Sequence, residues 1–225
     1  DGVTITDGMV DDNITIIAES PLTIDAPVTN TGGSSGEPYE VGAGDITLVA
    51  EGRAVVDDLI LNDDVTAICT NAANCDLNGY GDITLYAGDD IYQNADVTVE
   101  AEGLGNISYH AGVDYNKGNL RTGFNNIFPA LDSDIVMAST ADIVGEDGNI
   151  TLTATDNVVL GRDASGGVRT GGTVSITADD NTDYDLITGN TNGLADGVGA
   201  ITANTHMAGA DLEIVAPTII LNAAS

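Results

Sequence analysis

The sequence is poor in aromatic and basic residues. It contains no Trp, two Phe and five Lys and Arg residues against 36 Asp and Glu, so its formal net charge is −31. A chain this acidic is repelled by nucleic-acid phosphates and by anionic membrane surfaces, which excludes both as natural partners. The shortage of aromatic side chains also disfavours a glycan-active groove, in which rings would line one face.

Long apolar runs are absent too, so membrane insertion is not expected. The N-terminal residues do not resemble a signal peptide, and an exported protein would be represented here by its mature form or by a fragment. Asp supplies 28 of the acids, and Gly (28), Thr (25) and Asn (19) are abundant, which is typical of strands and turns. Because hydrophobic residues still make up 42% of the chain, we expect a folded body with its acids outside.

Cysteine is nearly absent: Cys69 and Cys75 are the two in the chain. Five residues lie between them, a spacing that suits a small disulfide loop, whereas the alternative is a pair of free thiols. A disulfide predicts an oxidising compartment, so we expect an extracellular or cell-surface protein.

A heptapeptide repeat organises the chain. Its clearest form is Gly-Asp-Ile-Thr-Leu-x-Ala, in which apolar residues at positions three, five and seven alternate with mostly polar ones. This period of two predicts a strand with one buried face, and the small Ala at position seven suits a close corner. The copies are Gly44–Ala50, Gly81–Ala87, Gly105–Ala111, Gly148–Ala154 and Gly172–Ala178, with weaker ones at Asp12–Ala18 and Gly199–Thr205.

The intervals between copies predict the architecture. Gly81 and Gly105 are 24 residues apart, as are Gly148 and Gly172, and the other intervals equal 24 plus an insertion. Such a unit accommodates three short strands and their corners, so we expect an all-β chain folded as a parallel β-solenoid of about seven coils. Residues 1–225 would form a single domain, with insertions near residues 29–43, 66–79 and 113–133. A barrel or sandwich is the structural rival, although antiparallel meanders do not require one recurring heptapeptide.

Stacking of equivalent positions makes this prediction specific. Position three should form an interior column and position four an outward column of hydroxyls. Position two should place Asn106 on Asn149, a favourable amide ladder, and Asp45 on Asp82, an unfavourable carboxylate pair. The interior column comprises Ile46, Ile83, Ile107, Ile150, Val174 and Ile201, and the hydroxyl column comprises Thr15, Thr47, Thr84, Ser108, Thr151, Ser175 and Thr202.

Three segments, GDITLYAGDDI, GNITLTATDNVVLG and SPLTIDAPV, resemble the repeats of filamentous-haemagglutinin-like exoproteins and related large repetitive bacterial adhesins. The resemblance covers about Asn13 to Ala216, and its degenerate motif constrains fold more than activity. It implies a right-handed β-helix on the outer surface of a bacterial cell. The secretion domain of that family has no recognisable counterpart in this sequence.

The sequence does not predict an enzyme, and we assign no catalytic residues. Five Asp-Asp pairs occur, but neighbouring residues on a strand point to opposite faces, and most of the pairs fall at expected corners. The five basic residues are too scattered to complete an acid–base site. The pairs are Asp11–Asp12, Asp57–Asp58, Asp63–Asp64, Asp89–Asp90 and Asp179–Asp180.

The acids do suggest cation binding. Asp-rich corners offer the oxygen ligands that Ca²⁺ prefers, although the calcium-binding nonapeptide of β-rolls and the EF-hand loop are absent. We expect Asp45 above Asp82, and Asp89, Asp156 and Asp180 at a common corner. Ca²⁺ held by these residues is one hypothesis, and a solvated acidic surface without an ion is the other. No further cofactor is expected.

The insertion from Val113 to Ser133 differs from the rest of the chain. It holds both phenylalanines and the single lysine, so it could be a recognition loop for surface glycans or for host and matrix ligands. The alternative is a flap that covers one side of the solenoid or contacts a neighbouring subunit. The residues concerned are Tyr115, Lys117, Arg121, Phe124 and Phe128.

Both ends of the sequence have strand-like residues and no capping segment. We therefore expect copies to stack end to end, C-terminal end on N-terminal end, although a longer polypeptide would supply the same neighbours covalently. We therefore expect the protein to function as an extracellular structural or adhesive rod. The alternative is a carbohydrate-binding or carbohydrate-cleaving β-helix. The expected assembly residues are Val3, Ile5, Ile214, Ile219, Ile220 and Leu221.

Overall fold

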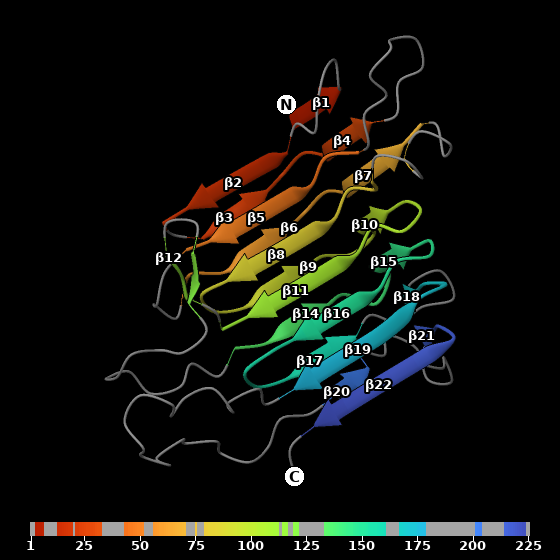
Figure 1. Ribbon diagram of the computed structural model, residues 1–225. Coiled ribbons are helices and arrows are strands. Elements are labelled where there is room, and N and C mark those ends of the chain that lie inside the picture. The colour runs from red at the N-terminus through yellow and green to blue at the C-terminus, as the bar shows by residue number, and fades with distance from the viewer. Residues whose placement is uncertain are drawn as a thin grey trace.

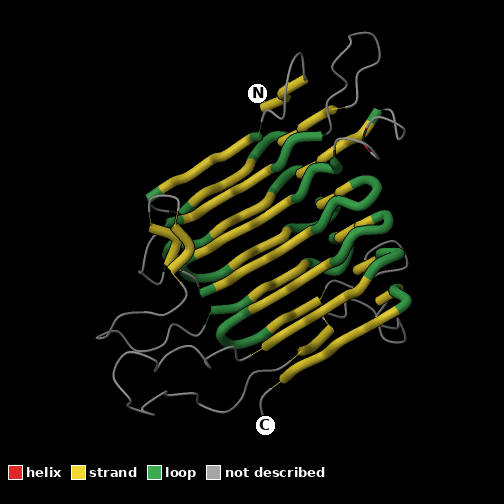
Figure 2. Tube along the Cα trace, in the orientation of Figure 1, coloured by secondary structure: helices red, strands yellow, loops and turns green. Residues whose placement is uncertain are grey.

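The alternation of apolar and polar residues seen in the heptapeptides corresponds to short strands, most of which are parallel to their neighbours. In the computed structural model, three sheets form the sides of a solenoid, and the chain passes from one to the next at corners (Figures 1 and 2). The structure describes residues 3–6, 13–19, 21–32, 43–51, 56–70, 75, 79–112, 114–116, 119–121, 133–160, 167–178, 201–203 and 214–223.

Sheets A and B each contain seven parallel strands among these residues, and the heptapeptides form most of sheet B. Sheet A comprises β1 (Val3–Thr6), β4 (Val28–Gly32), β7 (Val65–Cys69), β10 (Thr98–Ala101), β15 (Asp142–Gly145), β18 (Gly167–Arg169) and β21 (Ile214–Val215). Sheet B comprises β2 (Ile14–Ala18), β5 (Ile46–Ala50), β8 (Ile83–Ala87), β11 (Ile107–Ala111), β16 (Ile150–Thr153), β19 (Thr173–Ala178) and β22 (Thr218–Ala223).

Sheet C is narrower, with six described strands of three residues each. Five of them have the same apolar–variable–apolar pattern, and β9 ends in Gln93 instead. Successive strands of the chain visit sheets A, B and C in turn, which is the winding of a parallel β-solenoid, so the predicted fold class is confirmed. Sheet C comprises β3 (Leu22–Ile24), β6 (Leu59–Leu61), β9 (Ile91–Gln93), β14 (Ile135–Met137), β17 (Val158–Leu160) and β20 (Ile201–Ala203).

The insertions begin later than the sequence suggested in two cases. Residues 29–32 and 66–69 belong to strands β4 and β7 of sheet A. The third insertion contains an antiparallel hairpin of β12 (Asp114–Asn116) and β13 (Asn119–Arg121), which lies beside β8 of the solenoid. Among the described residues, no helix has the length and apolarity needed to cross a bilayer.

The interior column predicted from position three forms in sheet B, with one correction. Ile46, Ile83, Ile107, Ile150 and Val174 are successive partners in register, and all five are completely buried. The column does not continue to Ile201, because Ile201 pairs with Val158 in sheet C. Ile219 of β22 takes the place above Val174 instead.

The hydroxyl column needs the same correction. Thr202 lies in sheet C, and Ile220 follows Ser175 in sheet B. The error arose because strands of all three sheets share one apolar–Thr–apolar pattern, so a heptapeptide match does not identify its sheet. The 27-residue interval from Gly172 to Gly199 therefore does not measure one coil.

A single aromatic ring interrupts the aliphatic core of the described coils. Tyr109 of β11 is completely buried, and its hydroxyl donates to Oε1 of Gln93 at 3.1 Å. The Gln93 amide in turn donates to the backbone carbonyls of Val97 (2.9 Å) and Asp142 (2.8 Å). The network satisfies every polar group that it brings into the core, so it ties sheets A, B and C together without an unpaired donor.

Candidate functional site

The corner that leads into sheet B is a column of glycines. A Cβ added to Gly81, Gly105, Gly148 or Gly172 would collide with the backbone carbonyl of the glycine one coil earlier. Backbone therefore packs directly on backbone, and no side chain fits. We call this column, with the residue that follows each glycine, the glycine corner. It explains why position one of the heptapeptide is Gly.

The residues after these glycines form a ladder of side-chain acceptors. Asp45 Oδ1 accepts the backbone N–H of Asp82 (2.9 Å), and Asp82 Oδ1 accepts that of Asn106 (2.8 Å). Asn106 and Asn149 repeat the contact to the next coil, each at 3.0 Å. The predicted stacking of Asp45 on Asp82 and of Asn106 on Asn149 is thus confirmed. Each stacked carboxylate has a backbone N–H as partner, which offsets part of the like-charge repulsion.

The corner that leads into sheet C carries a ladder of the same kind, again formed by the residue directly before each strand. Oδ1 of Asp90 accepts the backbone N–H of Asp134 at 2.7 Å, and Oδ1 of Asp134 accepts that of Asn157 at 2.8 Å. Asp58 begins the column with a longer contact of 3.3 Å to the Asp90 N–H. The residue before each ladder residue is Asp or Ser and not Gly. We call these pairs of consecutive residues the aspartate corner. Its paired positions are Asp57–Asp58, Asp89–Asp90, Ser133–Asp134 and Asp156–Asn157.

Three carboxylates gather at the aspartate corner. One oxygen from each of Asp58, Asp89 and Asp90 lies within 4.8 Å of the others. Asp89 is 7% exposed, and its Oδ1 accepts a hydrogen bond from the Ser133 hydroxyl at 3.3 Å. Burial, followed by repulsion from Asp90 and Asp58, raises the pKa of Asp89 to about 6. The corner therefore concentrates negative charge where water screens it poorly.

The pKa values of Asp58 and Tyr92, which lie near Asp89, are raised as well. Burial, more than the charge of Asp90, raises the pKa of Asp58. Tyr92, on the outward side of β9, donates its hydroxyl to Oδ2 of Asp90, and that hydrogen bond is the main reason its own pKa rises. An arrangement of this kind can hold a proton or a cation, since either relieves the repulsion, and Ca²⁺ prefers carboxylate oxygens.

The predicted metal residues therefore separate into two places. Asp45 and Asp82 belong to the glycine corner. Asp89 and Asp156 occupy the same column of the aspartate corner with Ser133 between them, and Asp180 lies outside the described residues. Sequence reasoning noted the Asp57–Asp58 and Asp89–Asp90 pairs but did not bring Asp58 and Asp90 to one site. Their spacing of 32 residues, equal to that of Asn13 and Asp45, was the available signal.

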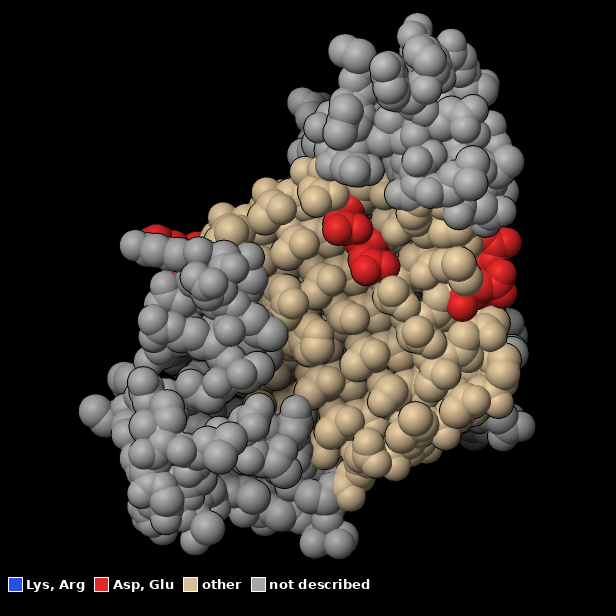
Figure 3. Space-filling model, in the orientation of Figure 1, with Lys and Arg blue, Asp and Glu red and all other residues tan. Residues whose placement is uncertain are grey.

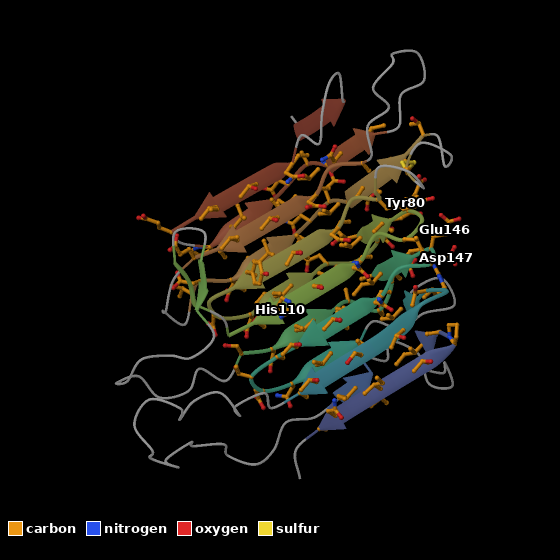
Figure 4. The ribbon with its side chains drawn as sticks, in the orientation of Figure 1. Tyr80, His110, Glu146 and Asp147 are labelled. Carbon is orange, nitrogen blue, oxygen red and sulfur yellow. A yellow bond between two sulfur atoms is a disulfide. The ribbon has the colours of Figure 1, made fainter. Side chains whose placement is uncertain are left out.

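The predicted disulfide between Cys69 and Cys75 is present, and it links the last residue of β7 to Cys75. Oε2 of Glu102 accepts the backbone N–H of Cys69 at 2.8 Å, and Oε2 of Glu146 accepts that of Gly103, one coil later, at 2.8 Å. Figure 4 shows Tyr80, Glu146 and Asp147 at this side of the solenoid, where the Tyr80 ring packs on Gly103. Glu102 and Glu146 thus link the ends of neighbouring sheet A strands by hydrogen bonds.

The predicted recognition loop is described only in part. Tyr115 pairs with Leu120, and Asp114 with Arg121, in the β12–β13 hairpin. Lys117, Phe124 and Phe128 lie outside the described residues. The hairpin itself was not foreseen, because its strands are three residues long and lack a marked alternation.

The C-terminal edge of sheet B carries the expected assembly residues. Ile219, Ile220 and Leu221 of β22 are 44%, 44% and 52% exposed, whereas Val174 and Ile176, which pair with Ile219 and Leu221, are completely buried. Ile214 in β21 is half-buried, and Val3 and Ile5 lie in β1 at the opposite end of sheet A. These residues therefore stand at the two ends of the described solenoid.

Comparison of the chain with protein-family models, with curated proteins and with solved structures finds no match.

Proposed function

We propose that this chain is a structural or adhesive β-solenoid of the extracellular space or cell surface, which assembles end to end into a rod. The observation that carries the proposal is the exposure of the last strand of sheet B. Ile219 continues an interior column whose members Ile107 and Val174 are completely buried, yet 44% of its own surface is exposed. A further parallel strand on β22 would bury it.

A second copy can supply that strand in register. Because Ile14 and Ile219 occupy the same column of sheet B, and Val3 and Ile214 the same column of sheet A, stacking places Ile14 of one copy over Ile219 of another. None of the residues in β1, β2, β21 and β22 is charged, so the strands that would meet bring no carboxylates together. Sheet C has one described strand fewer than the other two, and the contact would be continuous in sheets A and B alone.

The disulfide supports a role outside the reducing cytosol. Arg169, the basic residue with a described ion pair, contacts Asp142 at 3.1 Å in sheet A and not the aspartate corner. The resemblance to bacterial adhesin repeats fits the same role. A glycan-binding β-helix is the second candidate, and the insertion from Val113 to Ser133, which holds Phe124 and Phe128, is where its aromatic contacts would lie.

Light scattering on the isolated chain tests the assembly. We expect its mass to rise with concentration, and we expect Ile219→Lys to abolish the increase because the lysine charge would be buried between copies. Ile60→Lys is the matched control, since Ile60 is half-buried and points outward from sheet C. A wild-type chain that remains monomeric at high concentration, with both variants alike, contradicts end-to-end assembly.

A further inference from the structure

The winding of the chain determines which sheets a stacked copy can continue. The described strands begin in sheet A with β1 and end in sheet B with β22, and each full coil passes through sheets A, B and C once. A second copy whose β1 lies on β21 and whose β2 lies on β22 therefore begins in sheet A where a strand of sheet C is due. One sheet C strand is missing at each such contact.

A shift of the second copy along the solenoid does not remove this gap. The last described strand of sheet C in one copy is β20, and the first in the next copy is β3. Moving the second copy closer by one coil would bring β3 onto β20, but its β2 would then occupy the place of β22. The edges of β20 and β3 consequently face each other across two strand spacings, about 9.6 Å, and one extended strand fits between them. We call this space the sheet C gap.

The core residues beside the sheet C gap are incompletely covered. Leu59, Ile91 and Val158 of the interior coils are completely buried. Leu22 of β3 and Ile201 of β20 stand at the two ends of the same column, pack against the core and are half-buried. Stacking of sheets A and B would not cover these two side chains, because both belong to sheet C. A strand in the gap with apolar residues at its inward positions would bury them.

The backbone beside the gap sets few further requirements on such a strand. In the aspartate corner, a ladder residue donates its N–H to the side chain one coil earlier, as Asp90 does to Asp58. Pro21 holds the ladder position of the first coil, since it precedes Leu22 and Leu22 pairs with Leu59. Proline has no N–H, so the residue one coil earlier does not have to be an Asx acceptor.

Charge determines which flanking residues suit the gap. The residues of β3 and β20 are uncharged, but Asp25 directly follows β3, and each copy carries a net charge of −31. Figure 3 shows a similar contrast on sheet B, where the described surface over β19 and β22 bears no charged side chain and acids lie higher on the face and at its edge. A segment with an uncharged apolar centre and with Lys or Arg beside it therefore fits best.

We propose that the sheet C gap binds an extended segment of a partner protein, with an apolar–variable–apolar centre and basic flanks, as a parallel strand between β20 of one copy and β3 of the next. The proposal rests on the proposed end-to-end assembly, because a single copy has no such gap. Pairing along both edges distinguishes the gap from an ordinary sheet edge, which offers one ladder of backbone hydrogen bonds. A strand bound in this way contacts both copies and so strengthens the contact between them.

A labelled peptide, Lys-Asn-Val-Val-Leu-Gly-Lys, tests the gap. It places the sequence of residues 157–161, which includes β17, between two lysines. The control peptide Lys-Asn-Ser-Val-Ser-Gly-Lys has the same charge but lacks the two inward apolar side chains. Fluorescence anisotropy measures binding where light scattering shows rods, and on Ile219→Lys, in which stacking is blocked. We expect the first peptide to bind rods about tenfold more tightly than it binds Ile219→Lys, because two edges pair with it, and the control to bind neither.

A chain that carries the missing strand itself is the matched variant. Asn222 pairs with Thr177, which pairs with Thr153. Asn-Val-Val-Leu-Gly added after Ser225 therefore follows Asn222 at the distance at which residues 157–161 follow Thr153, and it reaches the gap in their register. Rods of the extended chain should form at lower concentration than rods of the original chain and should not bind the peptide.

The possible failures of the two proposals can be told apart. Rods that do not bind the peptide, that bind it no better than Ile219→Lys does, that bind the serine control equally, or that still bind the peptide after the extension would overturn the sheet C gap as a binding site and leave end-to-end assembly standing. A chain for which light scattering shows no rods would overturn both.

Discussion

The glycine corner and the aspartate corner have the same geometric role in the solenoid but are built from different residues. Each turns the chain into a sheet, and each follows with a ladder of Asx oxygens that accept the backbone N–H of the next coil. At the glycine corner, Gly148 packs so close to Gly105 that no Cβ fits, whereas the aspartate corner leaves room for the side chains of Asp89 and Ser133. Packing distance therefore decides whether a corner can accumulate buried charge.

The largest effect should come from filling the space that the glycine corner lacks. Gly148→Ala would drive a Cβ into the Gly105 carbonyl, and we expect it to lower the free energy of unfolding by about 3 kcal/mol. Ser133→Ala, at the equivalent position of the aspartate corner, removes the hydrogen bond to Asp89 without a steric clash and should cost about 1 kcal/mol. Urea unfolding of both variants measures the difference. Equal losses would mean that close packing does not distinguish the corners.

The second effect concerns cations at the aspartate corner. If Ca²⁺ binds Asp58, Asp89 and Asp90 with a dissociation constant of about 1 mM, 10 mM Ca²⁺ should stabilise the fold by about 1.4 kcal/mol. Melting curves in EDTA and in Ca²⁺ test this expectation, with Mg²⁺ as a control for ionic strength. Asp90→Asn should reduce the shift, while Asp82→Asn at the glycine corner should not. Identical melting curves with and without Ca²⁺ would exclude a bound cation as the way this charge is managed.

The third effect is a pH dependence specific to the aspartate corner. The folded pKa of Asp89, about 6, lies above the ordinary value of 3.8, so the native state binds its proton more tightly than the unfolded state does. Its contribution to stability is full below about pH 4 and is lost as pH rises through 6. Asp89→Asn should thus stabilise the fold at pH 7 by on the order of 1 kcal/mol, less than the full shift implies because the neighbouring Asp58 and Asp90 are only partly buried.

Unfolding curves of Asp89→Asn in EDTA at pH 7 and pH 4 check the sign. The gain should vanish at pH 4, where the wild-type carboxyl is protonated as well. A gain of equal size at both values would show that it comes from packing and not from the charge of Asp89.

The smallest effect should follow from the matched change at the glycine corner. Asp82→Asn keeps an oxygen for the N–H of Asn106 and adds an amide that can donate to Asp45, as Asn149 donates to Asn106 at 3.2 Å. One stacked charge is also removed, so we expect a gain of a few tenths of a kcal/mol. Thermal unfolding at low and high salt measures it, and salt should reduce the difference. A loss of stability would show that the carboxylate is the better acceptor in this ladder.

Much of sheet B could be predicted from the heptapeptides. Ile46, Ile83, Ile107 and Ile150 were placed in one buried column because strands that stack in register need the same residue type at the same position. The requirement for Gly at position one has the same origin, since Gly81 and Gly105 meet backbone to backbone. The alternation of buried and outward residues and the stacking of coils require the same residue types here, so the same pattern recurs along the chain.

The assignment of Ile201 failed for a related reason. Residues 201–203 have the alternation of a sheet B strand, but the solenoid places them in sheet C, above Val158. Strands of all three sheets bury every second residue, so alternation alone does not identify the sheet. Only the count of corners passed along the chain does, and that count is obscured where long connections intervene.

Sequence alone was sufficient for the parallel solenoid, its interior column from Ile46 to Val174 and the disulfide, because each depends on spacing that recurs or on a single possible pair. The meeting of Asp58, Asp89 and Asp90 was decided by the tertiary structure. Asp58 and Asp90 are 32 residues apart, a distance that becomes one coil only after the intervening strands have wound through sheets C, A and B. The burial that raises the pKa of Asp89 arises from that winding, since neighbouring coils and not neighbouring residues exclude the water around it.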